Sequence, residues 1–422
     1  MNKILLLISV FLTYCWGDDE LISVVVIFRH GARTPIDPYP NDPYKNSSFW
    51  PAGFGQLTNE GKKQHFELGQ WIRQRYSNFM PPVYSERDIY VRSTDVDRTL
   101  MSAEANLAGF YPPQKEFQSN LTWQPIPVHT VEETEDEILS MKKPCPKYNK
   151  MLGELFNQQF FLNISHKYHE LYAYLTNKTG ALVNTPDSVE YVYNTLTIEQ
   201  SYNFTLPSWT NKVFPEKMEY LASLSFAVEA YTPQLARLKT GPLFNLITEH
   251  FKNMTSYSYE HHNHSTENKW NRKFLMLSAH DTTIANVLNS MGLFDMHCPP
   301  FAATIIFEQR KRTNNSTYLN LFYKNSSNPI QLCLKGCELD CDLKTFIEIM
   351  KPIIVNPETW RNECELSWFD YSGSLLFSFC SLILISLVLI CAIKCLIIEK
   401  KINRSMYEQI SSEDDFIVNN KI

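Results

Sequence analysis

The spacing of apolar and polar residues predicts a sheet whose strands alternate with helices. Residues 24–28 are five apolar residues in a row, which is typical of a strand buried on both faces. Residues 274–277 form a second apolar run, and a shorter strand is predicted at 88–92. Further strands are predicted at residues 303–307, 318–323 and 330–334.

Amphipathic helices are predicted after these strands, at residues 58–76, after 94, at 284–291 and near 343–350. The candidate caps of the first three helices are Thr58, then Thr94 or Asp95, then Asp281 or Thr282. Repeated strand–loop–helix units predict an α/β fold with a central doubly wound mixed sheet flanked by helices.

The middle of the chain has a different character. Between residues 112 and 246, helical patterns such as 148–161 and 218–230 follow one another without apolar strands between them. We therefore predict a mostly helical cap that is inserted into the α/β domain and lines one side of a ligand site. The α/β domain is then divided into residues 18–111 and 247–365.

Both ends of the chain carry apolar segments. Residues 1–17 have the positive, apolar and small-residue regions of a secretory signal peptide. Residues 373–393 contain no charge and are long enough to span a bilayer, after a short stalk at 366–372. Because lysines and an arginine follow in the tail, 394–422, we predict a single-pass type I protein with its large N-terminal part in a lumen or outside the cell.

Charge and cysteine content agree with an exported protein. The net charge of −6 over 422 residues argues against a general nucleic-acid binder. Outside the signal and membrane segments an even set of six cysteines remains, which indicates disulfides. Cys337 and Cys341 have the spacing of half a zinc site, but we prefer a local bridge because no second ligand pair follows.

The density of Asn-x-Ser/Thr sequons predicts a glycosylated surface. The candidate sites are Asn46, Asn120, Asn163, Asn177, Asn203, Asn253, Asn263, Asn314, Asn315 and Asn325.

Cationic and titratable residues stand where three predicted strands end. Arg29-His30-Gly31-Ala32-Arg33 follows the first strand, Arg92 ends the second, and His280-Asp281 follows the third. Ligands of open α/β sheets bind at this edge, and arginine forks suit the oxygens of a phosphate monoester. His30 and Asp281 are the available nucleophile and proton donor, whereas His261-His262-x-His264 lies in a polar stretch and is interpreted as a solvated loop rather than a metal site.

Residues 29–35 resemble the signature of the histidine acid phosphatases, a branch of the phosphoglycerate-mutase-like superfamily. His280-Asp281 is similar to the second motif of this branch. Residues 39–44, 53–58, 91–109 and 123–130 resemble the animal lysosomal and prostatic members of the family, and the similarity covers about residues 21–365. The family resemblance implies an acid phosphatase.

The resemblance also implies individual roles. His30 would become phosphohistidine, and Asp281 would protonate the leaving alkoxide and then help to deprotonate the attacking water. The phosphoryl oxygens would be bound by Arg29, Arg33, Arg92 and His280, so no metal ion or other cofactor is implied. Three neighbouring residues are interpreted only as caps or ion pairs: Asp95, Asp97 and Arg98.

The surrounding charges predict an acid pH optimum. Positive neighbours disfavour a further charge on His30 and so depress its pKa, which keeps it a nucleophile in an acidic lumen. Asp281 must instead carry a proton when substrate is bound, so the rate is expected to fall as pH rises.

The resemblance implies the disulfides Cys145–Cys364 and Cys337–Cys341, which leaves Cys298–Cys333 by elimination. A further family bridge is absent, because Ile198 and Thr304 stand at its two positions. The resemblance also suggests a homodimer, for which Trp123 and His129 are candidate contacts, with ordinary packing as the alternative.

The tail holds Tyr407 and Ile410 in a Tyr-x-x-Φ pattern, which predicts binding to clathrin adaptors and sorting to lysosomal or endosomal membranes, either directly or through the cell surface.

Two alternative functions stay open. One is a narrower phosphatase for lipid, inositol or glycan phosphates, and the other is an inactive receptor or adhesion ectodomain. The complete set of candidate catalytic residues argues against the inactive ectodomain.

Overall fold

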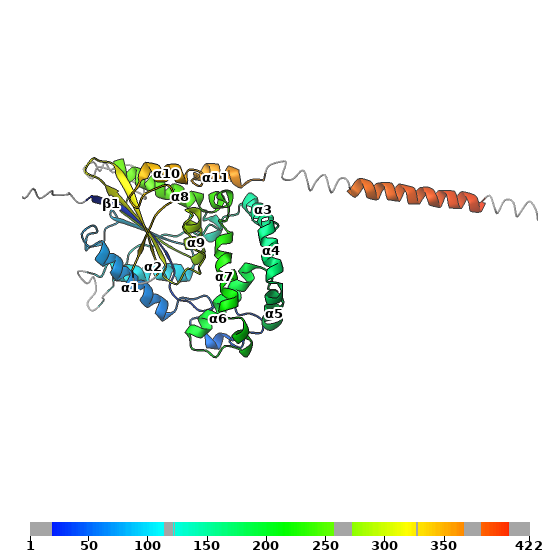
Figure 1. Cartoon of the computed structure of the whole chain (residues 1–422), viewed down its shortest axis with the longest axis horizontal. Coiled ribbons are helices and arrows are strands. Elements are labelled where there is room, and N and C mark those ends of the chain that lie inside the picture. Colours follow the sequence, from blue (N-terminus) through cyan, green and yellow to red (C-terminus); the bar gives the residue numbers. More distant parts are fainter. Residues whose placement is uncertain are drawn as a thin grey trace, which may run out of the picture. The chain divides into compact units, whose positions relative to one another are not determined.

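The computed structural model describes residues 19–113, 121, 123–256, 272–325, 328–366 and 381–404 (Figure 1). Within them, a seven-stranded sheet has the strand order β2-β3-β1-β4-β5-β6, with β7 paired to β5. The strands are β1 (Glu20–Arg29), β2 (Ile89–Ser93), β3 (Phe274–Ala279), β4 (Thr304–Lys311), β5 (Thr317–Lys324), β6 (Ile330–Leu332) and β7 (Cys341–Asp342). The α-helices in the described part of the chain up to residue 364 are α1 (Asn59–Arg75), α2 (Asp97–Phe110), α3 (Pro146–Leu155), α4 (Gln159–Lys167), α5 (His169–Thr179), α6 (Pro186–Ser201), α7 (Glu216–Val228), α8 (Pro233–Ser256), α9 (Asp281–Ser290), α10 (Leu343–Met350) and α11 (Pro357–Cys364).

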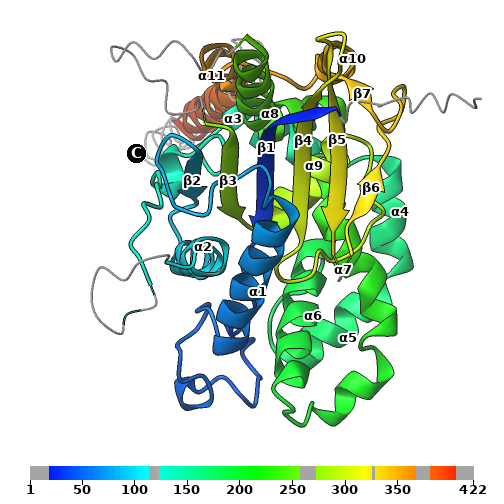
Figure 2. The ribbon, with the colours of Figure 1, turned by 90° about the vertical axis from the view of Figure 1, so that its left-hand side faces the viewer.

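Strand β1 is buried on both faces, as its apolar run predicts. Val25 and Ile27 point into the core beneath α8, α9 and α10, whereas Val24, Val26 and Phe28 pack beneath α1 and α2. None of these five side chains is exposed, and burial of each stabilises the fold by about 1.5–3 kcal/mol. Figure 2 shows α1 and α2 on one face of the sheet.

The sheet is mixed, which confirms the predicted fold class. β1 and β2 both pair in parallel with β3, while β4 runs antiparallel to β1. The carboxyl ends of β1, β2 and β3 therefore share one edge. In Figure 2 this edge faces the layer of helices that contains α6 and α7.

The helix starts agree with the sequence in one case and differ in two. Thr58 caps α1, because its Oγ1 accepts a hydrogen bond from the Gly61 amide at 3.1 Å. Helix α2 begins only at Asp97, with Val96 at its N-cap position and no side-chain cap. Helix α9 begins at Asp281, three residues before the predicted start.

The helices α3 to α7 form the predicted mostly helical region, with its own apolar core. Helix α8 belongs to both layers, because Leu235 and Leu238 lie in that core and Phe244 and Ile247 lie in the core of the sheet. The predicted boundary at residue 246 thus falls inside a continuous helix.

Two of the three predicted disulfides are present. Cys145–Cys364 joins the start of α3 to the end of α11, and Cys337–Cys341 closes a local loop before β7. The first bridge ties the helical region to the last helix of the sheet-bearing unit across 219 residues of sequence.

The predicted third bridge, Cys298–Cys333, is wrong, because both cysteines are free. Cys298 precedes β4 at the edge where β1 ends, and its Sγ lies 3.9 Å from Ser223 Oγ. Cys333 follows β6, which runs antiparallel to β5, with Ile330 opposite Tyr323 and Leu332 opposite Leu321. The chain therefore moves away from that edge of the sheet as it approaches Cys333. A disulfide requires Cα atoms within about 7 Å, and the assumption that every exported cysteine is paired caused the error.

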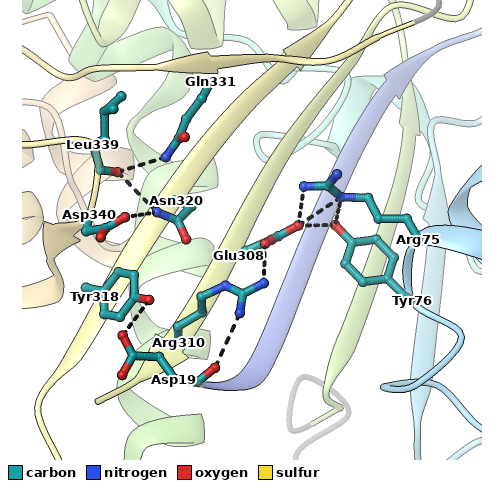
Figure 3. Close-up of polar contacts among 10 residues, drawn as sticks. All are labelled: Asp19, Arg75, Tyr76, Glu308, Arg310, Tyr318, Asn320, Gln331, Leu339 and Asp340. Atoms are coloured by element: carbon teal, nitrogen blue, oxygen red, sulfur yellow. Dashed lines mark hydrogen bonds and ion pairs between the residues drawn. The ribbon is translucent and has the colours of Figure 1, made fainter. Parts of the chain in front are cut away.

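A buried carboxylate on β4 links the sheet to the end of α1 (Figure 3). Glu308 is 2% exposed and accepts hydrogen bonds through Oε1 from Arg75 Nη2 at 2.7 Å and from the Tyr76 hydroxyl at 2.8 Å. Its Oε2 accepts from Arg310 Nη2 at 3.1 Å. The charge of Glu308 is thus compensated on both oxygens, as a buried carboxylate requires.

Residues 365–422 form a separate unit. Its described helix, Ser381–Arg404, contains an 18-residue window with a mean hydropathy of 2.9 and is long and apolar enough to cross a membrane. This helix overlaps the predicted span, 373–393, from residue 381 onward. The predicted signal peptide and the Tyr407 sorting pattern lie outside the described residues.

Most of the predicted glycosylation sites that the structure describes are at the surface. The exposed ones are Asn46, Asn163, Asn177, Asn203, Asn314, Asn315 and Asn325. Asn253 is half-buried, and Asn120 and Asn263 lie outside the described residues, as does the His261–His264 tract.

Candidate active site

The loops that follow three parallel strands bring His30, Thr94 and His280 together at one edge of the sheet. Arg29 is opposite Ala279 in the β1–β3 register, so His30 and His280 follow neighbouring strands at the same level. Their ring centroids are 5.8 Å apart. His280 Nε2 lies 3.0 Å from Thr94 Oγ1, just beyond β2, so the loops after all three strands meet here.

The loop after β1 is clamped between α1 and α2. The Gly31 amide donates to Ser102 Oγ at 3.1 Å, and a Cβ on Gly31 would lie 2.3 Å from the Gly61 carbonyl oxygen. Only glycine permits this approach. The Ala32 amide donates to Gln64 Oε1 at 2.9 Å, so both helices fix the backbone that carries His30 and Arg33.

His30 is buried and its orientation is fixed. Its Nδ1 lies 2.8 Å from the Gly31 carbonyl oxygen. Because a carbonyl can only accept, Nδ1 carries the proton and Nε2 carries the lone pair. Burial, followed by the charges of Arg29, Arg98 and Arg33, lowers the pKa of His30 well below its ordinary value. The imidazole is therefore a neutral base even in acid.

Arg29 pairs with the predicted proton donor. Arg29 Nη2 lies 2.8 Å from Asp281 Oδ2, and Asp281 Oδ1 accepts from the Thr282 amide at 2.8 Å. The Arg29 guanidinium also donates to the Pro299 carbonyl and covers the Phe301 ring at 4.2 Å. Burial raises the pKa of Asp281, but Arg29, Arg33 and His280 outweigh it and lower the pKa below its ordinary value.

Arg33 connects the site to the helical region. Its Nη2 donates to Asn194 Oδ1 on α6 at 3.0 Å. Burial, together with Arg29, lowers the pKa of Arg33 to about 10, so the guanidinium stays charged in acid. Asn194 had no signal in the sequence, because its role depends on how the helical region docks onto the sheet.

The structure does not place Arg92 with the other arginines. Arg92 Nη2 pairs with Asp136 Oδ1, and the exposed fractions of the two side chains are 7% and 0%. Asp136 also accepts the backbone amides of residues 138, 139 and 140. Arg92 is opposite Leu277 of β3, whereas Arg29 is opposite Ala279, so Arg92 lies two residues short of the level at which Arg29 reaches the sheet edge.

Arg98, interpreted from sequence only as a cap or ion pair, faces the site instead. It lies in the first turn of α2. Among the charges that lower the pKa of His30, that of Arg98 has the second largest effect, after that of Arg29. Burial lowers the pKa of Arg98, while nearby Asp281 and Glu133 raise it. Because α2 starts later than predicted, Arg98 stands at the helix N-terminus beside the sheet edge, and a correct helix start would have identified it.

The site has the donors that an anion needs. Among the described residues, the buried Nε atoms of Arg29, Arg33 and Arg98 have no hydrogen-bond partner in the protein. Burial and the charge of Arg98 lower the pKa of His280 to about 3, so this imidazole is neutral. Buried N–H donors without a partner are costly unless an anion accepts from them, so these three Nε atoms fit a phosphoryl group.

Comparison with known proteins agrees with this site. The model of the histidine phosphatase superfamily, branch 2, matches residues 20–324. Lysosomal acid phosphatase from Xenopus laevis is 38% identical over 83% of this chain and 80% of the relative. Human prostatic acid phosphatase is 37% identical over 84% of this chain and 92% of the relative.

A solved structure shows the same fold. The phytase from Citrobacter braakii superposes with a TM-score of 0.60 at 19% identity, over 82% of this chain and all of the phytase chain. At this identity the similarity concerns the fold alone. The family match over residues 20–324 shows that the chain belongs to branch 2 of the histidine phosphatase superfamily.

Proposed function

We propose that this protein, an acid phosphatase, hydrolyses phosphate monoesters by transferring the phosphoryl group to Nε2 of His30. The observation that carries the proposal is the state of this imidazole. It is 1% exposed, it is neutral, and its Nδ1 is held by the Gly31 carbonyl at 2.8 Å, so that the lone pair of Nε2 is available for attack.

The phosphoryl oxygens would be bound by Arg29, Arg33, Arg98 and His280. Arg98 replaces Arg92 in this set, because Arg92 is committed to Asp136. Preorganised guanidinium groups in a site with little water stabilise the charge that develops on the transferred group. Arginine stays charged throughout the acid range, so this stabilisation does not depend on pH.

Asp281 would carry the proton. In the free protein it is paired with Arg29, which favours the carboxylate. A bound phosphate dianion competes for Arg29 and adds negative charge, so it raises the pKa of Asp281 and promotes proton uptake at acid pH. Nε2 of His30 then attacks phosphorus, the P–O ester bond breaks, and the leaving oxygen takes the proton from Asp281.

In the second step, water attacks the phosphohistidine. The Asp281 carboxylate accepts a proton from this water, the P–N bond breaks, and phosphate leaves with His30 restored. A substitution tests the scheme directly. His30→Ala in the full-length protein should abolish phosphate release from an aryl phosphate across the acid range while Tm stays close to that of the wild type. Activity equal to the wild type would remove His30 from this role.

We further propose that the catalytic unit faces a lumen and is anchored in the lysosomal or endosomal membrane by the C-terminal helix. The apolar helix Ser381–Arg404 and the named lysosomal relatives support this proposal. Residues 1–17 would be the signal peptide, the exposed sequons would carry glycans, and Tyr407 and Ile410 would bind clathrin adaptors. A homodimer, with the 45% exposed Trp123 as a candidate contact, belongs to the same proposal. Protease protection of the catalytic unit in intact vesicles tests the orientation.

A further inference from the structure

A carboxyl group from the helical region faces the candidate catalytic residues. Glu190 lies on α6 one turn before Asn194, so the two residues share a helix face. Asn194 binds Arg33 at 3.0 Å, which shows that this face is turned toward the site. The charges that act on Glu190 come from Asp281, Arg33 and Arg29, and from Asp187 on its own helix.

Glu190 lies on the side where the alcohol part of a substrate would leave. In phosphoryl transfer the attacking and leaving oxygens or nitrogens stand roughly in line on opposite sides of phosphorus. If His30 attacks and Asp281 protonates the leaving oxygen, the alcohol lies on the Asp281 side. Glu190 lies on α6, outside the loop that carries His30, on the helix face that Asn194 turns toward Arg33. Among the charges that act on Glu190, that of Asp281 has the largest effect, so we place Glu190 beside the alcohol.

An acidic and aromatic cavity lies beside the same helix, α6, which contributes Tyr193 to its lining. Its volume is about 600 Å³, and its lining includes Tyr193, Glu216, Glu219 and Cys298, with no Lys or Arg among its described lining residues. Tyr193 is three residues after Glu190 on α6. The Cys298 thiol interacts with Glu190 and Asp281 as well as with Ser223, so it stands between the site and this cavity.

We propose that Glu190 and the adjoining acidic cavity select phosphate monoesters whose alcohol part carries a cationic group, such as a phosphorylated amino alcohol, over esters with further anionic groups. This inference rests on the proposed phosphatase function. A carboxylate binds an ammonium group through charge-assisted hydrogen bonds, and the face of Tyr193 can add a cation–π contact. A second anionic group in the same place meets the carboxylates of the cavity, whereas its basic lining residue, His297, is already paired with Asp295.

The preference should depend on pH, because Glu190 titrates above the acid range and changes its charge between about pH 5 and 8. Burial, with the charge of Asp281, raises the pKa of Glu190 to about 8, while Arg33 and Arg29 oppose the increase. The Cys298 thiol facing it stays uncharged, because burial raises its pKa to about 12. At acid pH Glu190 is therefore a neutral donor, and as pH rises it becomes an anion that attracts an ammonium group and repels a carboxylate.

Two esters of matched size test the proposal. Phosphoethanolamine and phosphoglycolate have two-carbon alcohol parts with opposite charges, and neither charge changes between about pH 5 and 8. The ratio of their kcat/KM values on the full-length protein reports the effect of the groups beside the alcohol part. The effects of His30 and of the arginines cancel in this ratio, because these residues act on both esters alike. Where turnover of either ester is slow, its inhibition constant against aryl phosphate hydrolysis measures its affinity, and the two affinities are compared in place of the kcat/KM values.

For the wild type we expect the ratio of phosphoethanolamine to phosphoglycolate to rise about tenfold over this pH range. The ratio should be flat in Glu190→Gln, which keeps the shape and removes the charge. The control is Glu170→Gln, an exposed residue on α5, which should behave as the wild type. A flat ratio in the wild type, or an unchanged rise in Glu190→Gln, overturns the inference, whereas a wild type that releases no phosphate from an aryl phosphate overturns the proposed function instead.

Discussion

Arg29 and Asp281 form an ion pair at the sheet edge, with Nη2 and Oδ2 2.8 Å apart. The pair joins a candidate phosphate ligand to the candidate proton donor, so anion binding and proton uptake are coupled. Arg29 alone would keep Asp281 ionised, and a bound phosphate dianion relaxes that effect.

The first prediction concerns the leaving group. Asp281→Asn should lower kcat for an alkyl phosphate by about 10²–10⁴, because an alkoxide needs a proton as it leaves. The loss for an aryl phosphate with an acidic phenol should be far smaller, since that leaving group is stable without a proton. Equal losses for both esters would show that Asp281 is not the proton donor.

The second prediction separates two arginines of similar sequence context. Arg98→Ala should lower kcat/KM by about 10²–10³ with little change in Tm, because it removes a charge from the transition state. Arg92→Ala should instead lower the free energy of unfolding by about 3–5 kcal/mol, since the buried Asp136 carboxylate loses its partner. Steady-state kinetics and thermal unfolding of both variants check the assignment, and the reverse outcome would restore Arg92 to the site.

The positions of these two arginines show what the sequence could and could not predict. The apolar run of β1 and the charged residues at the ends of β1 and β3 were enough to locate the sheet edge, because charged side chains such as Arg29 and Asp281 are buried only where a partner pairs with them. The sequence does not identify Arg98 as a site residue, because it predicts a cap at Thr94 or Asp95 and α2 begins only at Asp97. Helix starts depend on local backbone geometry that Thr94 and Asp95 do not reveal, since Thr94 bonds to Thr99 and His280 instead of capping the helix.

Other features depend on tertiary arrangement and have no local signal. Asn194 and Glu190 belong to a helix whose sequence resembles any half-buried helix, and only its docking over the sheet edge brings them to the site. The free state of Cys298 and Cys333 likewise follows from the direction of β6, which an even cysteine count cannot show.

The third prediction concerns a buried acid pair, Asp42 and Glu199, which are 2% and 0% exposed. Burial, followed by the charge of Asp42, raises the pKa of Glu199 to about 9, and burial raises that of Asp42 as well. A carboxyl group whose pKa is raised by folding stabilises the folded state fully at pH values below its ordinary pKa. This stabilisation is lost as the pH rises toward the pKa of the group in the folded protein. Tm should therefore fall between about pH 5 and 8 in the wild type.

The neutral variant Glu199→Gln tests this directly. It keeps a polar group of the same size beside Asp42 and removes one titrating proton, so its Tm should change less with pH than that of the wild type. Parallel Tm curves for the two proteins would show that the pair does not govern the pH dependence of stability.

The fourth prediction concerns the network in Figure 3. Glu308→Ala should lower the free energy of unfolding by about 2–3 kcal/mol, because Arg75 and Tyr76 lose their common acceptor and remain partly buried. Since the network lies at the end of α1 remote from His30, kcat should be unchanged. Denaturant unfolding and kinetics of the same sample measure both quantities, and a loss of kcat at full stability would contradict this account.

The most direct test of the central claim is to trap the intermediate. Full-length protein is mixed with a substrate that carries a labelled phosphoryl group, quenched within a turnover, and mapped by peptide. We predict label on His30 alone, stable in base and lost in acid, and no label in His30→Ala. Label on another residue, or rapid turnover with no labelled protein in a series of quench times, would contradict the phosphohistidine scheme.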